Sequence, residues 1–559
     1  MRSTMRIIQG LAFATALVTA ASPVMSADYD LVINGGRVMD PETQYDAVAN
    51  VGISDGKIAV ITKSAIKGKQ TIDAKGLVVA PGFIDTHFHS VDPFATKLVV
   101  ADGVTTGMDL EAGATRIAEW YARKEKAGWQ VNYGTTVGMN LVRMLVHDPE
   151  VKINEPIDAS NGGRYINESA KDGVQGWSLT RSSLPQMNQI MQLLDEGLRE
   201  GAIGIGFPLA YAARGITSYE QFEAQRTAAR YGRLASVHTR YHLNTQTPTE
   251  APIALDEVLV NAMLLKAPLL LAHDNDYGWW ENEEKLQMAR KQGFNVWGEY
   301  YPFAAGSTLV SADFLRPDLW EKTLGNKYEE TIYDPGADKF LSKDEYLKMV
   351  KEKPGYFIVV HFPPRKKWMK YWLSIPEMVV ASDAMQGVDK DGNLLPWDAD
   401  VRKYAGHPRT ASSYSTTLKL ARDNGVPLMF TLSQLSYWTA KHLGDTGLEA
   451  MKQRGRVQVG KIADLTLFDP KTVAPRATYK NGENGLPPVG IPYVIVNGTI
   501  VVNEGKVLPV KPGQPIRFPV EPKGRYERLD ASKWFSEHAI NVPDMHGVDD
   551  TGARDLLKR

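Results

Sequence analysis

Short apolar runs alternate with helical stretches through the middle of this chain, and this alternation limits the fold more than any other feature. One unit shows it clearly. Ser182 and Ser183 can cap a helix, and Pro185 suits its first turn. Apolar residues then recur at helical spacing as far as Leu198, and Gly201 follows. The next residues, 202–207, have the composition of a buried strand. Repeated units of this kind predict a parallel sheet covered by helices.

The chain contains nine strand-length runs, one more than an eight-stranded barrel needs. They cover residues 82–85, 104–110, 133–137, 202–207, 234–237, 268–272, 294–298, 357–360 and 378–381. Residues 309–370 are rich in Lys, Glu, Trp and Pro and interrupt the alternation, so we assign the run at 357–360 to an inserted lid. We therefore predict an α/β fold, a (β/α)8 TIM-like barrel over 81–454 with an insertion at 309–370.

The two ends of the chain have a different pattern. Short strands and turns fill 28–80, strand-like runs with a hairpin fill 455–517, and we expect both to share a small β-sandwich domain. Residues 518–559 are polar and predict a C-terminal surface tail. Residues 1–27 resemble a secretory signal peptide, because Arg2 and Arg6 precede a short apolar stretch and small residues. This predicts export across the inner membrane to the periplasm, with a membrane anchor as the alternative.

Charge and cysteine content exclude several kinds of chemistry. The chain has 64 Lys and Arg against 65 Asp and Glu, a formal net charge of −1, which argues against a nucleic-acid partner. It has no cysteine, so disulfides, thiolate nucleophiles and sulfur-bound zinc are all excluded. Any metal ion must be held by His, Asp or Glu.

Candidate metal ligands lie where predicted strands end. In the segment 81–89, His87 and His89 are two residues apart, so both imidazoles can face the same ion. A pair of this kind is weak evidence by itself. However, Glu111, His238, His273 and Asp383 each follow another apolar run. The carboxyl ends of barrel strands all open on one face, so these six residues predict a site for zinc or a similar divalent ion.

These features together resemble the amidohydrolase superfamily of metal-dependent hydrolases. The resemblance rests on the segment 81–89, the strand-end residues His238, His273 and Asp383, and the sheet built from both ends. The segments 238–240, 299–302, 305–308 and 406–409 are similar to motifs of the D-aminoacylases, or N-acyl-D-amino-acid deacylases. The similarity extends to about residue 517.

The resemblance implies a role for each residue that matches a family motif. His87 and His89 would bind one zinc ion and His238 and His273 a second, although other divalent metals remain alternatives. Glu111 would bridge the two, in place of the usual cysteine. The remaining roles are Asp383 as metal ligand and proton acceptor, Tyr211 as a catalytic residue that stabilises the oxyanion, and Tyr301, Arg409, Ser307 and Asn275 as substrate-binding residues.

Two positions differ from the family pattern, and a third offers another candidate ligand. Asn275 stands where the family often has Lys, and His242 where it often has an acidic residue. His361 also ends an apolar run and is the main rival for a ligand role.

The predicted function is zinc-dependent hydrolysis of a non-peptide amide bond, by metal-activated water, in an N-acyl-D-amino acid or a related small N-acyl amide. A cyclic-amide hydrolase or a dipeptidase on the same barrel is the alternative, since fold alone fixes neither. A binding protein without activity would be expected to have lost some of the ligands. The oligomeric state is left open.

Overall fold

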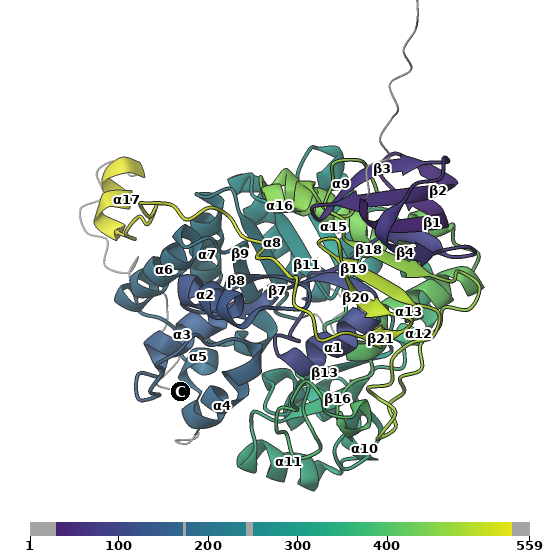
Figure 1. Ribbon diagram of the computed structural model, residues 1–559. Coiled ribbons are helices and arrows are strands. Elements are labelled where there is room, and N and C mark those ends of the chain that lie inside the picture. Colours follow the sequence, from purple (N-terminus) through teal and green to yellow (C-terminus); the bar gives the residue numbers. More distant parts are fainter. Residues whose placement is uncertain (1–28, 171–174, 242–249, 539–559) are drawn as a thin grey trace, which may run out of the picture.

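The computed structural model describes residues 29–170, 175–241 and 250–538, and its centre is an eight-stranded parallel sheet (Figure 1). The strands are β6 (Phe83–Asp85), β7 (Val104–Ala114), β8 (Asn132–Gly138), β9 (Gly204–Pro208), β10 (Leu234–His238), β11 (Leu269–Ala272), β12 (Val296–Tyr300) and β17 (Val379–Val380). Each lies beside the next one in chain order. All eight coincide with predicted runs. The expected signal peptide and His242 lie outside the described residues.

The first and last strands of this sheet meet, so the sheet closes into a barrel. Phe88 forms a parallel bridge with Ala384, and the Asp85 carboxylate accepts the backbone N–H of Ser382 at 3.1 Å. The predicted (β/α)8 barrel is therefore confirmed. Its helices are α1 (Pro93–Ala101), α2 (Ile117–Ala127), α3 (Met139–His147), α4 (Ala159–Ser169), α5 (Gly176–Leu179), α6 (Leu184–Arg199), α7 (Ser218–Ala229), α8 (Glu250–Leu265), α9 (Trp279–Lys291), α13 (Arg409–Asp423), α14 (Leu428–Leu432), α15 (Trp438–Asp445) and α16 (Glu449–Lys452).

Helix α6 shows how the sequence determines these elements. Ser183 and Gln186 form a reciprocal capping box, and Pro185 occupies the first turn. The apolar face from Met187 to Leu198 is buried against the barrel. The predicted helix and its start are confirmed.

The two chain ends share one nine-stranded sheet. Its strands are β1 (Tyr29–Asp40), β2 (Tyr45–Ser54), β3 (Lys57–Thr62), β4 (Gly68–Asp73), β5 (Val78–Pro81), β18 (Leu465–Phe468), β19 (Tyr493–Val496), β20 (Thr499–Asn503) and β21 (Lys506–Val507). Strand β5 joins the two halves, because it pairs with β1 in parallel and with β18 in antiparallel register. Apolar side chains from both halves, including Ile33, Val51 and Leu465, form a core of their own.

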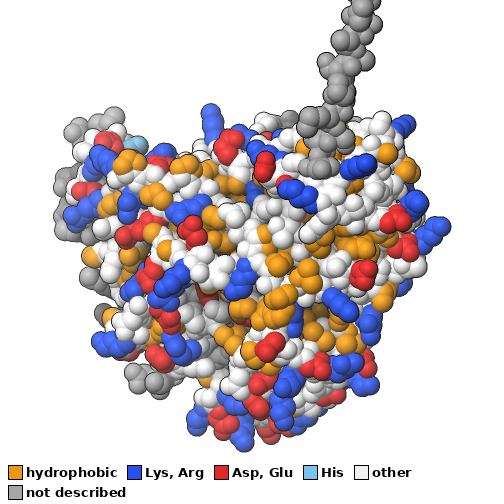
Figure 2. Space-filling view, in the orientation of Figure 1, with side chains coloured by type: hydrophobic (Ala, Val, Ile, Leu, Met, Phe, Trp, Pro, Cys, Tyr) orange, Lys and Arg blue, Asp and Glu red, His pale blue; other side chains and the backbone are white. Residues whose placement is uncertain are grey.

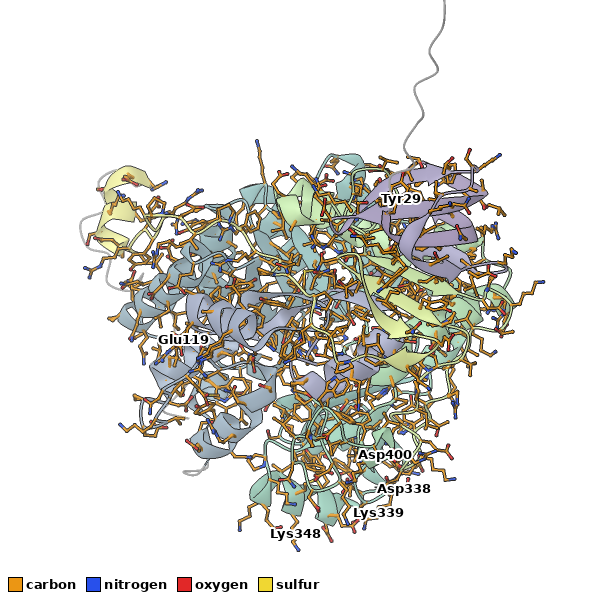
Figure 3. The ribbon with its side chains drawn as sticks, in the orientation of Figure 1. Tyr29, Glu119, Asp338, Lys339, Lys348 and Asp400 are labelled. Carbon is orange, nitrogen blue, oxygen red and sulfur yellow. The ribbon has the colours of Figure 1, made fainter. Side chains whose placement is uncertain are left out.

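The insertion is a small subdomain with a four-stranded sheet in the order β13–β16–β14–β15. Its elements are β13 (Ala305–Leu309), α10 (Tyr328–Thr331), β14 (Ile332–Asp334), β15 (Lys339–Phe340), α11 (Lys343–Glu352), β16 (Phe357–His361) and α12 (Arg365–Trp372). The run at 357–360 forms β16, which pairs in this sheet and not in the barrel sheet. The subdomain encloses its own apolar cluster, which includes Trp320 and Tyr346. Figure 3 shows Asp338, Lys339 and Lys348 of this subdomain at the opposite end of the view from Tyr29.

After the nine-stranded sheet, the chain runs along α6 and forms α17 (Ala531–His538). Glu521 N–H donates to Arg199 O, and Arg525 N–H to the Asp195 carboxylate, both at 2.9 Å. Over the described ranges, no helix has both the length and the apolar character needed to cross a membrane. Basic and acidic side chains are interspersed over the face shown in Figure 2, in keeping with the net charge of −1.

Candidate metal centre

The six predicted ligands come together at the carboxyl ends of the barrel strands, and all are buried. They form three overlapping groups, and within each group the ligand atoms lie within 4.8 Å of one another. The groups are His87–His89–Glu111, His87–His273–Asp383 and Glu111–His238–His273. Six side chains from five different strand ends therefore converge on one small volume, as the barrel geometry requires.

Glu111 lies between the two pairs of histidines. Its Oε2 is 3.0 Å from His87 Nε2 and 3.1 Å from His89 Nε2. Its Oε1 is 2.5 Å from His238 Nδ1 and 3.7 Å from His273 Nε2. Because the two oxygens face different pairs, this carboxylate has the geometry of a ligand shared between two ions.

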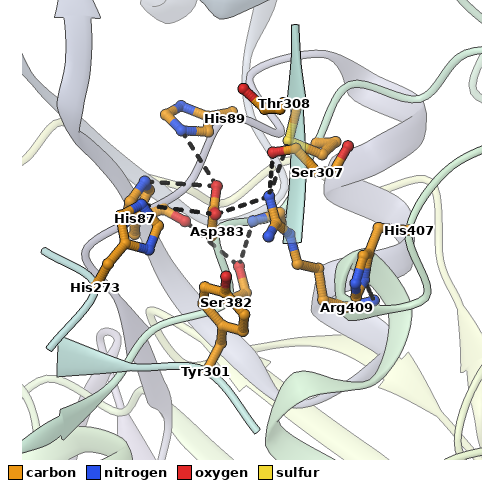
Figure 4. Close-up of polar contacts among 12 residues, drawn as sticks. His87, His89, His273, Tyr301, Ser307, Thr308, Ser382, Asp383, His407 and Arg409 are labelled. Atoms are coloured by element: carbon orange, nitrogen blue, oxygen red, sulfur yellow. Dashed lines mark hydrogen bonds and ion pairs between the residues drawn. The ribbon is translucent and has the colours of Figure 1, made fainter. Parts of the chain in front are cut away.

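Asp383 completes the centre from the last barrel strand. Its Oδ1 lies 3.5 Å from His87 Nε2 and 3.4 Å from His89 Nε2, and its Oδ2 lies 3.9 Å from His273 Nε2 (Figure 4). Asp383 and His273 both have left-handed backbones, with φ of 50° and 59°. This conformation is uncommon for residues other than glycine and is found at functional sites. The strained turns point both side chains at the centre directly after their strands end.

Two further carboxylates, which the sequence did not single out for a role, orient the first pair of histidines. Glu299 Oε1 is 2.5 Å from His87 Nδ1, and Asp109 Oδ2 is 3.0 Å from His89 Nδ1. These contacts fix each ring so that Nε2 faces the centre, an arrangement typical of metal-binding histidines. A signal for Asp109 was present, since it lies two residues before Glu111 on the same strand face. Glu299 is the last residue but one of β12, so the strand-end rule could also have found it.

The charges at the centre favour cations. Burial lowers the pKa of His87, but the carboxylates of Glu111, Asp383 and Glu299 outweigh it, and the net pKa is well above the ordinary value. At His89, burial likewise lowers the pKa, but the Asp109 carboxylate raises it, and the net pKa is about 10. Burial raises the pKa of Glu111, but the neighbouring histidines lower it more, and the net pKa is well below the usual range. Oriented nitrogen and oxygen donors of this kind fit one or two divalent ions.

We expect metal uptake at pH 8 to release at least one proton per chain. His89 carries its proton at that pH because its pKa is about 10, and a metal ion requires the neutral imidazole. Calorimetric titration of the metal-free protein with Zn²⁺, in buffers of different ionisation enthalpy, measures the number released. The control variant Asp109→Asn should release fewer protons, since it removes a carboxylate that raises this pKa. Identical heats in all buffers would contradict the expectation.

Arg409 forms an ion pair with Asp383, with Nη2 at 2.8 Å from Oδ2. The same nitrogen lies 3.2 Å from Ser307 O, and His407 Nδ1 accepts the Arg409 backbone N–H at 3.0 Å. The guanidinium is completely buried, and its Nε and Nη1 have no hydrogen-bond partner among the described residues. Arg409, a predicted substrate-binding residue, therefore keeps unpaired donors beside Asp383.

A cavity adjoins the centre at His238, His273 and Asp383; we call it the polar cavity because Ser307, Thr308 and Arg365 also line it. Tyr301 and Ser307, two of the predicted substrate-binding residues, line it, and so does Arg365, which the sequence did not identify. Arg365 comes from the inserted subdomain, donates to Tyr301 Oη, and pairs with both oxygens of Asp276 at 2.8 and 2.6 Å. A guanidinium thus enters the cavity from an unexpected part of the chain.

The other predicted residues fall in different places. Asn275 is fully buried, contacts Tyr301 O at 3.4 Å, and is absent from the cavity lining. Tyr211 lies over the centre, with its ring edge-on to His238 and its hydroxyl 2.9 Å from Thr308 Oγ1. Burial raises its pKa, so the phenol stays neutral. The rival His361 packs against Tyr333, Phe340 and Tyr479, outside all three ligand groups.

Sequence comparisons find similarity to amidohydrolases. A family model described as "Amidohydrolase family" matches residues 70–140. The chain is 26% identical over 501 residues to a D-aminoacylase from Alcaligenes xylosoxydans xylosoxydans, covering 86% of this chain and 96% of that protein. An N-acyl-D-glutamate deacylase from the same organism is 25% identical over 513 residues, covering 85% and 94%.

The fold is also similar to a solved structure. An N-acyl-D-glutamate deacylase from Bordetella bronchiseptica, complexed with zinc and a phosphonate that mimics the tetrahedral intermediate, matches with a TM-score of 0.67. The two chains are 21% identical, and the match covers 88% of this chain and 100% of the other.

Proposed function

Because this chain belongs to the amidohydrolase superfamily and is similar to its D-aminoacylases, we propose that it is a zinc-dependent hydrolase that deacylates N-acyl-D-amino acids. The observation that carries the proposal is the ligand cluster beside a cavity lined by Tyr301, Arg365 and Asp383, with Arg409 behind it. Zinc is proposed because the donor set suits it and because the B. bronchiseptica deacylase was solved with that metal. Glu111 favours two ions per chain.

Asp383 is placed to transfer protons during amide cleavage. Its carboxylate faces the centre, and the ion pair with Arg409 holds it in one orientation. It can accept a proton from the attacking water and deliver that proton to the departing nitrogen, the usual role of a general base and acid. Bound divalent ions would polarise the amide carbonyl and lower the pKa of the water.

Tyr211 is positioned to stabilise the negative charge that develops on the carbonyl oxygen. Its neutral hydroxyl can donate a hydrogen bond, and the contact with Thr308 Oγ1 limits the directions it can point. A donor that is already oriented costs no reorganisation when the charge appears. The catalytic role expected for Tyr211 is consistent with this position.

The amino-acid carboxylate would bind in the polar cavity. Arg365 and Tyr301 line it, and Arg409 offers unpaired donors from behind Asp383. Arg365 brings a positive charge to a region where the family Lys is replaced by Asn275. Asp276 already forms an ion pair with Arg365, so a ligand carboxylate would have only part of the guanidinium left to bind.

A substrate screen tests the proposal. The zinc-loaded enzyme should hydrolyse an N-acyl-D-amino acid faster than its L enantiomer and faster than the corresponding amide. Loss of a charge-assisted contact in Arg365→Met should lower kcat/KM for the free acid by roughly tenfold to a hundredfold. The exposed neighbour Lys366→Met is the matched control and should change little. Activity confined to lactams, hydantoins or dipeptides would reassign the enzyme to the alternative class.

We also propose that residues 1–27 direct export and that the mature enzyme works in the periplasm. The support is the basic, apolar and small-residue order of that segment. Sequencing the N-terminus of protein recovered from a periplasmic fraction tests this. Cleavage after Ser26 or Ala27 supports it, and a retained Arg6 contradicts it.

A further inference from the structure

A second cavity, of about 120 Å³, reaches the metal centre at His89 and Glu111, and its walls are mostly apolar. Its apolar side chains come from α3, α4, the segment around α5 and the inserted subdomain, and are Leu141, Met144, Ile166, Trp177, Leu309 and Phe357. The polar cavity meets the centre at other residues, His238, His273 and Asp383. Tyr211 lines both. The centre therefore has an apolar cavity and a polar cavity leading from different ligands.

The polar side chains in the apolar cavity are mostly occupied with the protein itself. Asp158 caps α4 by accepting the Ser160 N–H at 2.9 Å and also accepts Trp120 Nε1–H at 2.8 Å. Gln386 donates to Ala159 O at 2.6 Å. Asn140 donates to Pro208 O at 2.9 Å, which leaves its Oδ1 as a single open acceptor in the wall. Among the described residues that line this cavity there is no Lys or Arg that could bind an anion.

Two glycines in α4, Gly162 and Gly163, line this cavity. A glycine inside a helix is less favourable than alanine, so its presence there requires a reason. Packing supplies one at Gly163, where an added Cβ would lie 3.2 Å from Gly355 O. It supplies none at Gly162, where the nearest atom would be Ile157 Cγ2 at 4.0 Å. The missing side chain of Gly162 leaves its volume to the cavity.

The two cavities suit the two halves of an N-acyl amino acid. The scissile carbonyl must lie at the metal centre, so the acyl group and the amino acid leave it in different directions. Arg365 and Tyr301 make the polar cavity the place for the amino-acid carboxylate. We infer that the apolar cavity binds the acyl group, and that bulky acyl groups, medium-chain aliphatic or aromatic, are preferred to acetyl. This inference rests on the proposed function.

An acyl series on one D-amino acid tests the inference directly. For the acetyl, butanoyl, hexanoyl and phenylacetyl derivatives, kcat/KM should rise by roughly fourfold per added methylene until the cavity is full. Gly162→Leu should remove the advantage of hexanoyl over acetyl, measured as the ratio of the two kcat/KM values within that variant. Gly162→Ala is the matched control, because it also relieves the helix of a glycine but occupies little of the cavity.

Binding of the product acids gives a readout that does not depend on activity. Calorimetry should show that hexanoate binds the wild-type enzyme at least tenfold more tightly than acetate, and that Gly162→Leu abolishes the difference. Equal kcat/KM across the series, with no effect of Gly162→Leu, would overturn the inference and leave the proposed function intact. If no derivative is hydrolysed, the proposed function is wrong. The hexanoate measurement then decides the assignment of the cavity alone.

Discussion

The variant Asp383→Asn is expected to keep its fold and much of its metal but to lose catalysis. General acid–base transfer contributes about 10²- to 10⁴-fold to rates, so kcat should fall by that factor. Asn is a suitable replacement, because it has nearly the same shape and tolerates the left-handed backbone that residue 383 adopts, with φ of 50°. The amide oxygen can still accept from Arg409. The measurement is turnover at saturating substrate.

Two controls distinguish loss of the general base from loss of the bound metal or of the folded structure. Metal content after dialysis shows whether the ions remain, and the melting temperature shows whether burying Arg409 without its anionic partner destabilises the protein. Turnover close to wild type in a metal-loaded, folded Asp383→Asn protein would assign proton transfer to another residue.

The second large effect is expected for Glu111→Gln. This carboxylate contacts all four histidines of the centre through its two oxygens, so the amide removes the charge that both ion positions share. At least one ion per chain should be lost, and with it most of the activity. Elemental analysis after dialysis against metal-free buffer measures the loss.

A graded control is available in Glu299→Gln, which changes the partner of His87 without removing a ligand. Loss of such an outer partner typically lowers metal affinity or activity by about 10- to 100-fold, so its effect should be smaller than that of Glu111→Gln. Unchanged metal content and rate in Glu111→Gln would rule out the bridging role.

The barrel strands and the six converging side chains were predictable because they depend on local patterns. Each strand is an apolar run of the right length, and each of these residues stands at or near the end of one. Barrel topology then brings strand ends together whatever the distance in sequence. The same reasoning placed the run at 357–360 outside the barrel, because its surroundings break the alternation.

The remaining features depend on contacts that no local pattern records. Glu299 is far from His87 in sequence, and their pairing follows only from closure of the sheet, which leaves β17 alone between β12 and β6. Arg365 lies in a subdomain whose own packing decides which of its many charged side chains turns inward. The positive φ of His273 and Asp383 is likewise imposed by the site, since nothing in their residue types requires it.

The sheet shared by the two chain ends has a consequence for the order in which the molecule is assembled. Strand β5 is made early, but its antiparallel neighbour β18 follows only after the whole barrel. A chain emerging from the ribosome thus carries an open strand edge at β5 while the whole barrel is being made, and such edges invite pairing with other chains. Closing it requires contacts between very distant parts of the sequence, which are slow to form. The strand that protects the open edge of β5 is thus made only after the whole barrel.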